Sequence, residues 1–330
     1  MVEIAPLHVP LQRRRQTFSV FLWASFLPIC LVLFLFGLAV PLFWPILFAY
    51  LIWAYFDTAP RTGSRRNNWI RSLPCWRWFV EFFPIAIVKE AELDPKQNYL
   101  FGYHPHGIIA VGAWGAFGTE GAHVSKIFPG LNIRLLTLDS NFNVPFYRDL
   151  LMAFGLASVD KKSCNNILQK GPGNSCMIVV GGASESLTAF PGTFNLILKR
   201  RYGFVKVAMR NGARLVPVLS FGETDVYDQV QAPAGTWLHK VQRKIQDIFG
   251  FTTPIFIGRG IFIYDFGALP RRRPIHVVVG TPIEVKQMDN PTNEDAEVYH
   301  KQYMNQLQEI FEKYKDVYAA ERQSDLKFVE

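Results

Sequence analysis

Charged residues are missing from a long stretch near the N-terminus. From Gln16 to Phe56 the chain runs for 41 residues without Asp, Glu, Lys, Arg or His. One membrane crossing needs roughly 20 apolar residues, so this segment is about twice as long as a single helix requires. The length predicts two apolar helices with a turn near residues 37–45. A cleaved signal peptide is disfavoured, because the apolar stretch is too long and has no small-residue cleavage pattern.

Arginines flank both ends of this segment. They are Arg13, Arg14 and Arg15 before it, and Arg61, Arg65, Arg66 and Arg71 after it. Basic flanks tend to stay in the cytosol, so a hairpin with both ends on that side is expected. The turn carries no polar residue for a lumen, so two full crossings and a hairpin embedded in one leaflet are equally compatible. Trp69, Trp76 and Trp78 are expected at the membrane interface.

Several classes of site lack their signatures. The four cysteines have no metal-site spacing, and neither HExxH nor CxxC occurs, so no metal is predicted. The GxSxG nucleophile elbow is absent, because Ser184 lies in GGASES, which disfavours a serine hydrolase. The net charge of +8 fits an anionic membrane surface or an anionic substrate. Nucleic acid is disfavoured, because the basic runs border the apolar segment and no nucleic-acid module is found.

Residues 95–330 have the pattern of a mixed α/β domain, after a basic N-terminus (1–15), the apolar hairpin (16–56) and an interfacial basic and aromatic segment (57–94). Strands are predicted at residues 99–103, 133–138, 176–180, 215–221 and 275–279. Helical stretches are predicted at 145–154 and 195–209, and an amphipathic packing helix over 298–317. The alternation favours a mixed sheet with flanking helices.

Two histidines surround a proline in the sequence HPHG. His104 and His106 are two residues apart, so an extended backbone would turn them to the same side. Pro105 favours that extended form. An imidazole can accept a proton from an alcohol at neutral pH. A pair of structurally hydrogen-bonded histidines is the alternative at this point, and zinc lacks further ligands.

A carboxylate follows a second apolar strand. The segment CMIVV ends in Gly181 and Gly182 and is followed by Glu185. Catalytic groups in α/β sheets favour this carboxyl edge, so Glu185 is predicted to orient a histidine. A simple surface carboxylate is the alternative.

A set of lysines and arginines is a candidate for binding the phosphates of coenzyme A. Its members are Arg148, Lys161, Lys162, Lys170, Lys199, Arg200, Arg201 and Arg210. The segment from Lys199 to Arg201 is the strongest candidate. Charge runs are more often solvated faces, so each residue alone is a weak signal.

The chain resembles the type-2 diacylglycerol acyltransferase family, which includes monoacylglycerol and wax-alcohol acyltransferases. The resemblance rests on six blocks in the family's order: the basic-flanked hairpin, FGYHPHG (101–107), residues 143–163, VVGGASESL (179–187), residues 200–223 and residues 258–283. One departure is Phe82-Phe83-Pro84, which replaces the family's Tyr-Phe-Pro.

The resemblance implies transfer of an acyl group from acyl-CoA to diacylglycerol, at the endoplasmic reticulum membrane and lipid droplets, with the catalytic domain in the cytosol. Acyl-CoA is a co-substrate, and no tightly bound cofactor is expected. His106 is predicted as general base, with Glu185 holding its imidazole and His104 shaping the site, although the two histidines could exchange roles. Predicted substrate-binding residues are Pro105, Gly107, Arg148, Gly181, Gly182, Lys199, Arg200 and Arg201.

Membrane lipids are expected partners, and a homo-oligomer stays open. The alternatives from other classes are a non-catalytic lipid-droplet scaffold or lipid carrier, which would need neither histidine, and a lipid hydrolase.

Overall fold

The computed structural model of the chain describes every residue except 1–2, 231–235, 238–239, 243, 245–253 and 330. A seven-stranded sheet forms its centre, in the order β1-β10-β7-β2-β5-β3-β4. The strands are β1 (Ala86–Lys89), β2 (Tyr99–His104), β3 (Asn132–Thr137), β4 (Ala157–Ser158), β5 (Asn174–Val179), β7 (Arg214–Phe221) and β10 (His276–Val279). All neighbouring pairs are parallel except β10 with β7, which confirms the mixed sheet.

Short strands lie outside the main sheet in two small sheets. These pair β6 (Asn195–Ile197) with β11 (Lys327–Val329), and β8 (Asp228–Gln229) with β9 (Phe256–Ile257). The central seven-stranded sheet also includes β1, which begins before the predicted domain start at residue 95.

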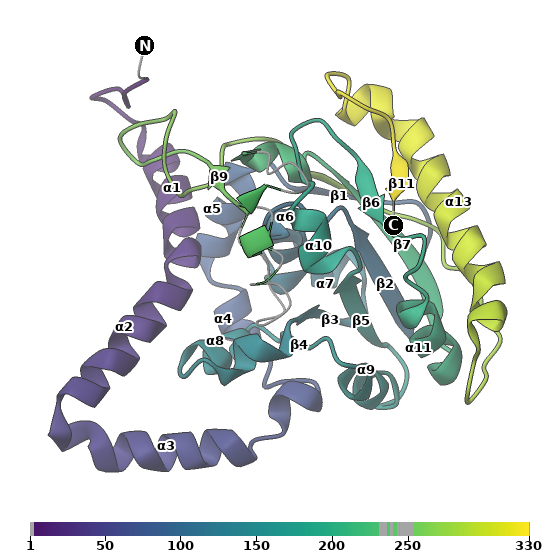
Figure 1. Ribbon diagram of the computed structural model, residues 1–330, viewed down its shortest axis with the longest axis horizontal. Helices are drawn as coiled ribbons and strands as arrows, with labels where there is room; N and C mark the ends of the chain where they lie inside the picture. The colour runs from purple at the N-terminus through teal and green to yellow at the C-terminus, as the bar shows by residue number, and fades with distance from the viewer. Residues whose placement is uncertain (1–2, 231–235, 238–239, 243, 245–253, 330) are drawn as a thin grey trace.

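Helices cover both faces of the sheet. One face packs against α9 (Lys161–Leu168), α11 (Gly203–Asn211) and α13 (Asn293–Tyr318). Figure 1 shows α13 in yellow along one flank. The other face carries α5 (Pro74–Phe82), α6 (Val111–Ala113), η3 (Trp114–Gly118) and part of α8 (Tyr147–Ala153). Further short helical elements are α4 (Asn68–Arg71), α7 (Val124–Ile127), α10 (Gly182–Ser186), η2 (Ala59–Arg61), η4 (Asp139–Asn143) and η5 (Glu223–Val226). The two central strands β2 and β7 are thus buried on both faces, in keeping with their continuous apolar sequences.

The apolar segment forms three helices. They are α1 (Leu11–Ala24), α2 (Phe26–Ala39) and α3 (Trp44–Phe56), with a short turn of helix, η1 (Pro41–Phe43), between the last two. Figure 1 shows α2 and α3 extending from the body and meeting at an open corner rather than lying alongside each other. By length and composition, residues 41–61 could cross a membrane, and α1 with α2, bent by 54°, would be a second such stretch if counted as one. Most apolar side chains of α2 and α3 are exposed, which suggests membrane association.

The first helix is part of the body rather than a free membrane segment. Val20 of α1 is fully buried, and the Trp23 ring lies 5.3 Å from that of Phe79 in α5. Trp76, expected at the membrane interface, is instead 2% exposed and packs edge-on against Phe154. The helix that carries it is amphipathic, and its aromatic face fills the space between α1 and the sheet. Trp69, in contrast, is exposed as expected.

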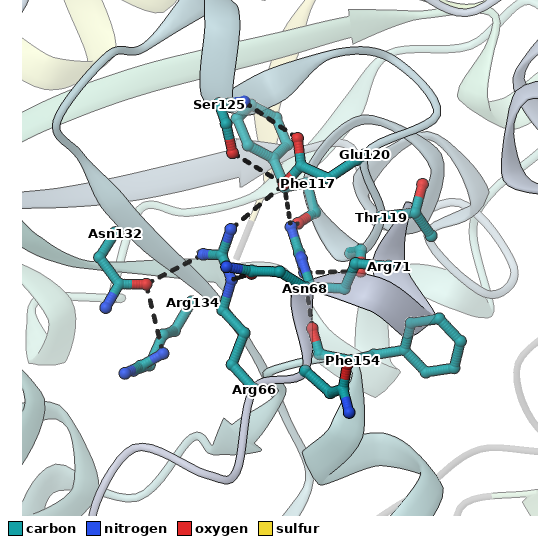
Figure 2. Close-up of polar contacts among 12 residues, drawn as sticks. Arg66, Asn68, Arg71, Phe117, Thr119, Glu120, Ser125, Asn132, Arg134 and Phe154 are labelled. Atoms are coloured by element: carbon teal, nitrogen blue, oxygen red, sulfur yellow. Dashed lines mark hydrogen bonds and ion pairs between the residues drawn. The ribbon is translucent and has the colours of Figure 1, made fainter. Parts of the chain in front are cut away.

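A buried arginine network fastens the segment after α3 to the body (Figure 2). Arg71 is 2% exposed and donates hydrogen bonds to the backbone carbonyls of Gly118 and Phe154, at 2.7 and 2.6 Å. Arg66 and Arg71 both lie 3.2 Å from the carboxylate of Glu120. Burial lowers the pKa of Arg71 to about 10, so it remains charged at neutral pH. Two guanidinium groups therefore share one carboxylate where the segment after α3 contacts the body of the protein.

Candidate active site

Three polar residues of the candidate site lie at the carboxyl ends of neighbouring strands. His104 is the last residue of β2, Glu185 follows β5 in α10, and Glu223 follows β7. These three strands are adjacent in the order β7-β2-β5, so the parallel topology collects their ends at one edge. The sequence predicted Glu185 at this edge and a strand ending just before His104, and the structure adds Glu223.

His104 is buried against the C-terminal helix. Its Nε2 atom lies 3.0 Å from the hydroxyl of Tyr303, which donates its proton to the carbonyl oxygen of Gly102 at 2.8 Å. Because that carbonyl can only accept, His104 Nε2 must carry a proton and donate it to Tyr303. Nδ1 then holds the lone pair, and it has no hydrogen-bond partner among the described residues. Burial, with the nearby His300, lowers the pKa of His104 to about 3, so this ring is neutral.

His106 has a different environment. β2 ends at His104, the His104–Pro105 peptide bond is cis, and His106 lies beyond the strand, directly before the turn at residues 107–109. The Nδ1 atom of His106 is 3.1 Å from the carbonyl oxygen of Gly107. That carbonyl accepts, which assigns the proton to Nδ1 and leaves the lone pair on Nε2. Burial lowers the pKa of His106, so the ring is neutral and able to accept a proton.

Glu185 binds the backbone of residues 105–110, called the histidine loop from here on, rather than an imidazole. Its carboxylate accepts hydrogen bonds from the backbone N–H of His106 at 2.7 Å and of Ile197 at 2.9 Å. Between the described residues Glu185 and His106 the structure has a hydrogen bond to the His106 backbone, and the predicted contact with the His106 ring is not found. Gly181 allows this arrangement, since a Cβ there would overlap the Glu185 carboxylate. Burial raises the pKa of Glu185 to about 7, against the two backbone hydrogen bonds and Arg201.

Glu223 is a second buried carboxylate beneath the same loop. It accepts hydrogen bonds from the Tyr103 hydroxyl at 2.6 Å and from the backbone N–H of Gly112 at 2.9 Å. Gly107 has φ of 57°, and a Cβ there would lie 2.9 Å from Glu223 Cγ, so only glycine fits this contact. Burial raises the pKa of Glu223 to about 7. Sequence reasoning missed this residue, although a carboxylate directly after a buried strand and a glycine is the same signal that identified Glu185.

The predicted substrate-binding residues are distributed over several places. Pro105 is buried within the loop, and Gly182 has φ of 59° at the start of α10. Lys199, Arg200 and Arg201 are exposed just before α11, and the charge of Arg201 reaches Glu185. This basic segment therefore lies near the candidate site, as its use for an anionic substrate requires.

Arg148 is not near that segment. It is 3% exposed, its guanidinium lies 2.7 Å from the Asp57 carboxylate, and it stacks over Trp53 at 5.4 Å. Its charge is compensated at the end of α3, so it anchors that helix, and the predicted contact with coenzyme A has no support in this geometry.

The profile of the Diacylglycerol acyltransferase family matches residues 35–329. The chain is 50% identical to "Diacylglycerol O-acyltransferase 2A" of Umbelopsis ramanniana, over 99% of this chain and 93% of that protein. It is 49% identical to "Diacylglycerol O-acyltransferase 2" of Dictyostelium discoideum and 47% identical to "2-acylglycerol O-acyltransferase 1" of Bos taurus, each over 99% of both chains. The chain belongs to the diacylglycerol acyltransferase family.

Membership has direct consequences. The protein is an acylglycerol O-acyltransferase of glycerolipid synthesis, and the family implies acyl-CoA and acylglycerol as substrates. The scaffold and hydrolase alternatives are thereby set aside. Relatives named for diacylglycerol and for 2-acylglycerol acceptors are similar to the chain at nearly equal identity. Among solved structures, the 1-acyl-sn-glycerophosphate acyltransferase of Thermotoga maritima has a TM-score of 0.37 at 9% identity, over 84% of this chain and 95% of that one.

Proposed function

We propose that this acyltransferase transfers the acyl group of acyl-CoA to the free hydroxyl of diacylglycerol, with His106 as general base. The observation that carries this proposal is the Nδ1 contact of His106 with Gly107, which leaves a lone pair on Nε2 of a neutral, half-buried ring. His104 is less suited, because it is fully buried and its pKa of about 3 makes proton uptake costly.

In this reaction Nε2 of His106 takes the hydroxyl proton as the oxygen attacks the thioester carbonyl. The C–O bond forms, the C–S bond breaks, and the leaving thiolate of coenzyme A takes the proton from the imidazolium. No acyl-enzyme is required, because a thioester is already activated. The apolar surroundings of the loop limit competing hydrolysis by water.

The carboxylates support this chemistry as positioning residues. Glu185 fixes the backbone of His106, and Glu223 fixes Gly112 in α6, which directly follows the same loop. Glu185 also joins this loop to β6, which leads directly into the basic segment at residues 199–201. We assign these three basic residues to the phosphates of acyl-CoA, so both substrates would meet beside His106.

Membrane attachment follows from the apolar helices. α2 and α3 have 14 and 13 residues, which corresponds to about 20 Å each and is less than the roughly 30 Å hydrocarbon core. Residues 41–61 taken together are long enough to cross, so we propose attachment either by a crossing there or by a hairpin embedded in one leaflet. We place the protein at the endoplasmic reticulum membrane, with the catalytic body in the cytosol and access to lipid droplets.

The acceptor is tested by competition. Microsomes containing the wild-type chain would receive labelled oleoyl-CoA with diacylglycerol, 2-monoacylglycerol and hexadecanol together, beside microsomes with His106→Ala at matched expression. Labelled triacylglycerol from the wild type alone supports the proposal. Labelled diacylglycerol or wax ester as the main product would overturn the acceptor assignment, and equal product from His106→Ala would overturn the base. The second candidate is a 2-acylglycerol acyltransferase, which the 47% identical relative favours.

A further inference from the structure

A cavity of about 640 Å³ lies apart from the histidine loop, between the N-terminal segment, α1 and residues 259–264. Its apolar walls include Ala5, Leu7, Phe18, Phe21, Ile261 and Phe262. Its volume falls within the range of small-ligand sites. Neither the proposed reaction nor any residue assigned to it uses this cavity.

Backbone hydrogen bonds build one wall of the cavity. The N–H of Ala5 donates to the carbonyl of Phe262, and the N–H of Tyr264 donates to the carbonyl of Glu3, both at 2.8 Å. Ile4 and Ile263 form an antiparallel bridge between them. The N-terminal segment is thereby held against residues 262–264, so this wall of the cavity has a defined shape.

Two arginines are the charged residues in the described lining. The Nε atom of Arg14 donates to the Val9 carbonyl at 3.0 Å, and Arg259 stacks over the Tyr264 ring at 4.1 Å. Among the residues that the structure describes, neither arginine forms an ion pair with a carboxylate. Their terminal nitrogens are thus available to an anion, beside walls that suit a hydrocarbon chain.

The surroundings indicate where such an amphiphile would come from. Phe18 on α1 is 54% exposed and Phe262 is 76% exposed, so the apolar lining opens outward. α1 leads directly into α2, whose apolar side chains are largely exposed. Arg13, Arg14 and Arg15 form the type of basic run that binds anionic lipid surfaces.

We propose that this cavity binds one acyl chain of an anionic membrane phospholipid, with its headgroup held by Arg14 and Arg259. The lipid would fix the N-terminal segment and α1 at the membrane surface. This site is independent of the proposed catalytic chemistry, and it is tested without an activity measurement.

The test uses full-length protein in vesicles that contain phosphatidylserine with a photoactivatable group near the end of one acyl chain. Matched vesicles contain phosphatidylcholine with the same label. After irradiation, peptide mapping should place the phosphatidylserine label on residues 4–9, 14–21 and 259–264. Arg14→Gln and Arg259→Gln should each lower this labelling about fivefold, as expected for one basic residue at an anionic surface. Thr17→Trp, which fills the cavity, should abolish it.

Arg13→Gln is the matched control, because Arg13 is the neighbour of Arg14 on α1 and does not line the cavity. It removes one charge of the basic run without touching the lining, so it should lower the labelling clearly less than Arg14→Gln does. Equal labelling by the two lipids, or unchanged labelling in Arg14→Gln and Arg259→Gln, would overturn the proposal. Displacement of the label by excess oleate, oleoyl-CoA or diacylglycerol but not by unlabelled phosphatidylserine would also overturn it, because the occupant would then be another lipid. Circular dichroism of each variant separates loss of binding from loss of folding.

Discussion

The hydroxyl of Tyr303 lies between His104 and the strand that carries it. It donates to the Gly102 carbonyl at 2.8 Å and accepts from His104 Nε2 at 3.0 Å, across 199 residues of sequence. Tyr303 is fully buried on α13, with its ring edge-on to the imidazole at 5.8 Å. The C-terminal helix therefore fixes the tautomer of His104 as well as covering the sheet.

Removal of this hydroxyl should disturb the site. In Tyr303→Phe, the His104 N–H and the Gly102 carbonyl lose their shared partner in a buried setting. We expect the free energy of unfolding to fall by about 2 kcal/mol and kcat to fall about tenfold or more, because the histidine loop shifts. Acyl transfer per folded molecule measures this effect. Tyr314→Phe on the same helix is the control, and equal kcat in both variants would contradict the assigned role.

Gly102→Ala, a change on the strand that faces Tyr303, should also lower stability and kcat. A Cβ at Gly102 would overlap the Tyr303 hydroxyl, which is otherwise in contact with the strand. The added methyl group therefore displaces Tyr303 rather than removing its hydroxyl. We expect lower kcat and a lower melting temperature for Gly102→Ala, and the double variant with Tyr303→Phe should lose little more than either alone. Additive losses would show that the two residues act independently.

Glu223 predicts a specific pH dependence of stability. Its pKa in the folded protein is about 7, above the 4.5 of an ordinary glutamate. The folded state therefore binds the proton more tightly, so this group stabilises the protein most below pH 4.5. The contribution is lost as pH rises through about 7, on the order of 3 kcal/mol in total.

Glu223→Gln isolates this effect, because the amide oxygen can still accept from Tyr103 and Gly112. Chemical unfolding of both proteins between pH 5 and 8 gives the difference in stability. The variant should gain stability relative to wild type as pH rises. The difference must be taken between the two proteins, since the lowered pKa of His106 acts in the opposite direction below pH 6.5. A pH-independent difference would contradict the buried, proton-binding carboxylate.

The arginine network in Figure 2 predicts a large structural effect at Glu120. Arg66 and Arg71 both pair with this carboxylate, and Arg71 is almost completely buried. Glu120→Gln leaves two guanidinium groups without a counter-charge, so the free energy of unfolding should fall by about 3 kcal/mol. Glu92→Gln is the control, because the Lys89–Glu92 pair is mainly exposed and should contribute less than about 1 kcal/mol. Similar losses in both variants, measured by denaturant unfolding, would contradict this assignment.

Much of the sheet could be predicted from the sequence. All five predicted strands are present. Strands that are buried on both faces consist of continuous apolar runs, which can be recognised in the sequence. The helices near residues 145–154 and 298–317 are also present. The stretch 195–209 was predicted as helix throughout, but Asn195–Ile197 is a strand and the helix begins only at Gly203. That strand exists because it pairs with β11 at the distant C-terminus, which local periodicity cannot indicate.

Several residues of the site could be predicted from the sequence, but the contacts between them could not. The sequence identified His104, His106 and Glu185 from their positions after apolar strands. It could not show that Glu185 binds a backbone N–H instead of a ring, because that choice depends on where the loop folds back. Tyr303 was not predicted as part of the site, because it lies in a helix whose apolar pattern indicates only packing.

The most direct test of the central claim is the rate of acyl transfer by His106→Gln, compared with the wild type at equal membrane content and with saturating oleoyl-CoA and diacylglycerol. Loss of a general base should lower kcat by about 10²–10⁴-fold, while the melting temperature changes little. That result would support proton transfer to Nε2 of His106. Turnover within a few-fold of wild type by the folded variant would contradict it.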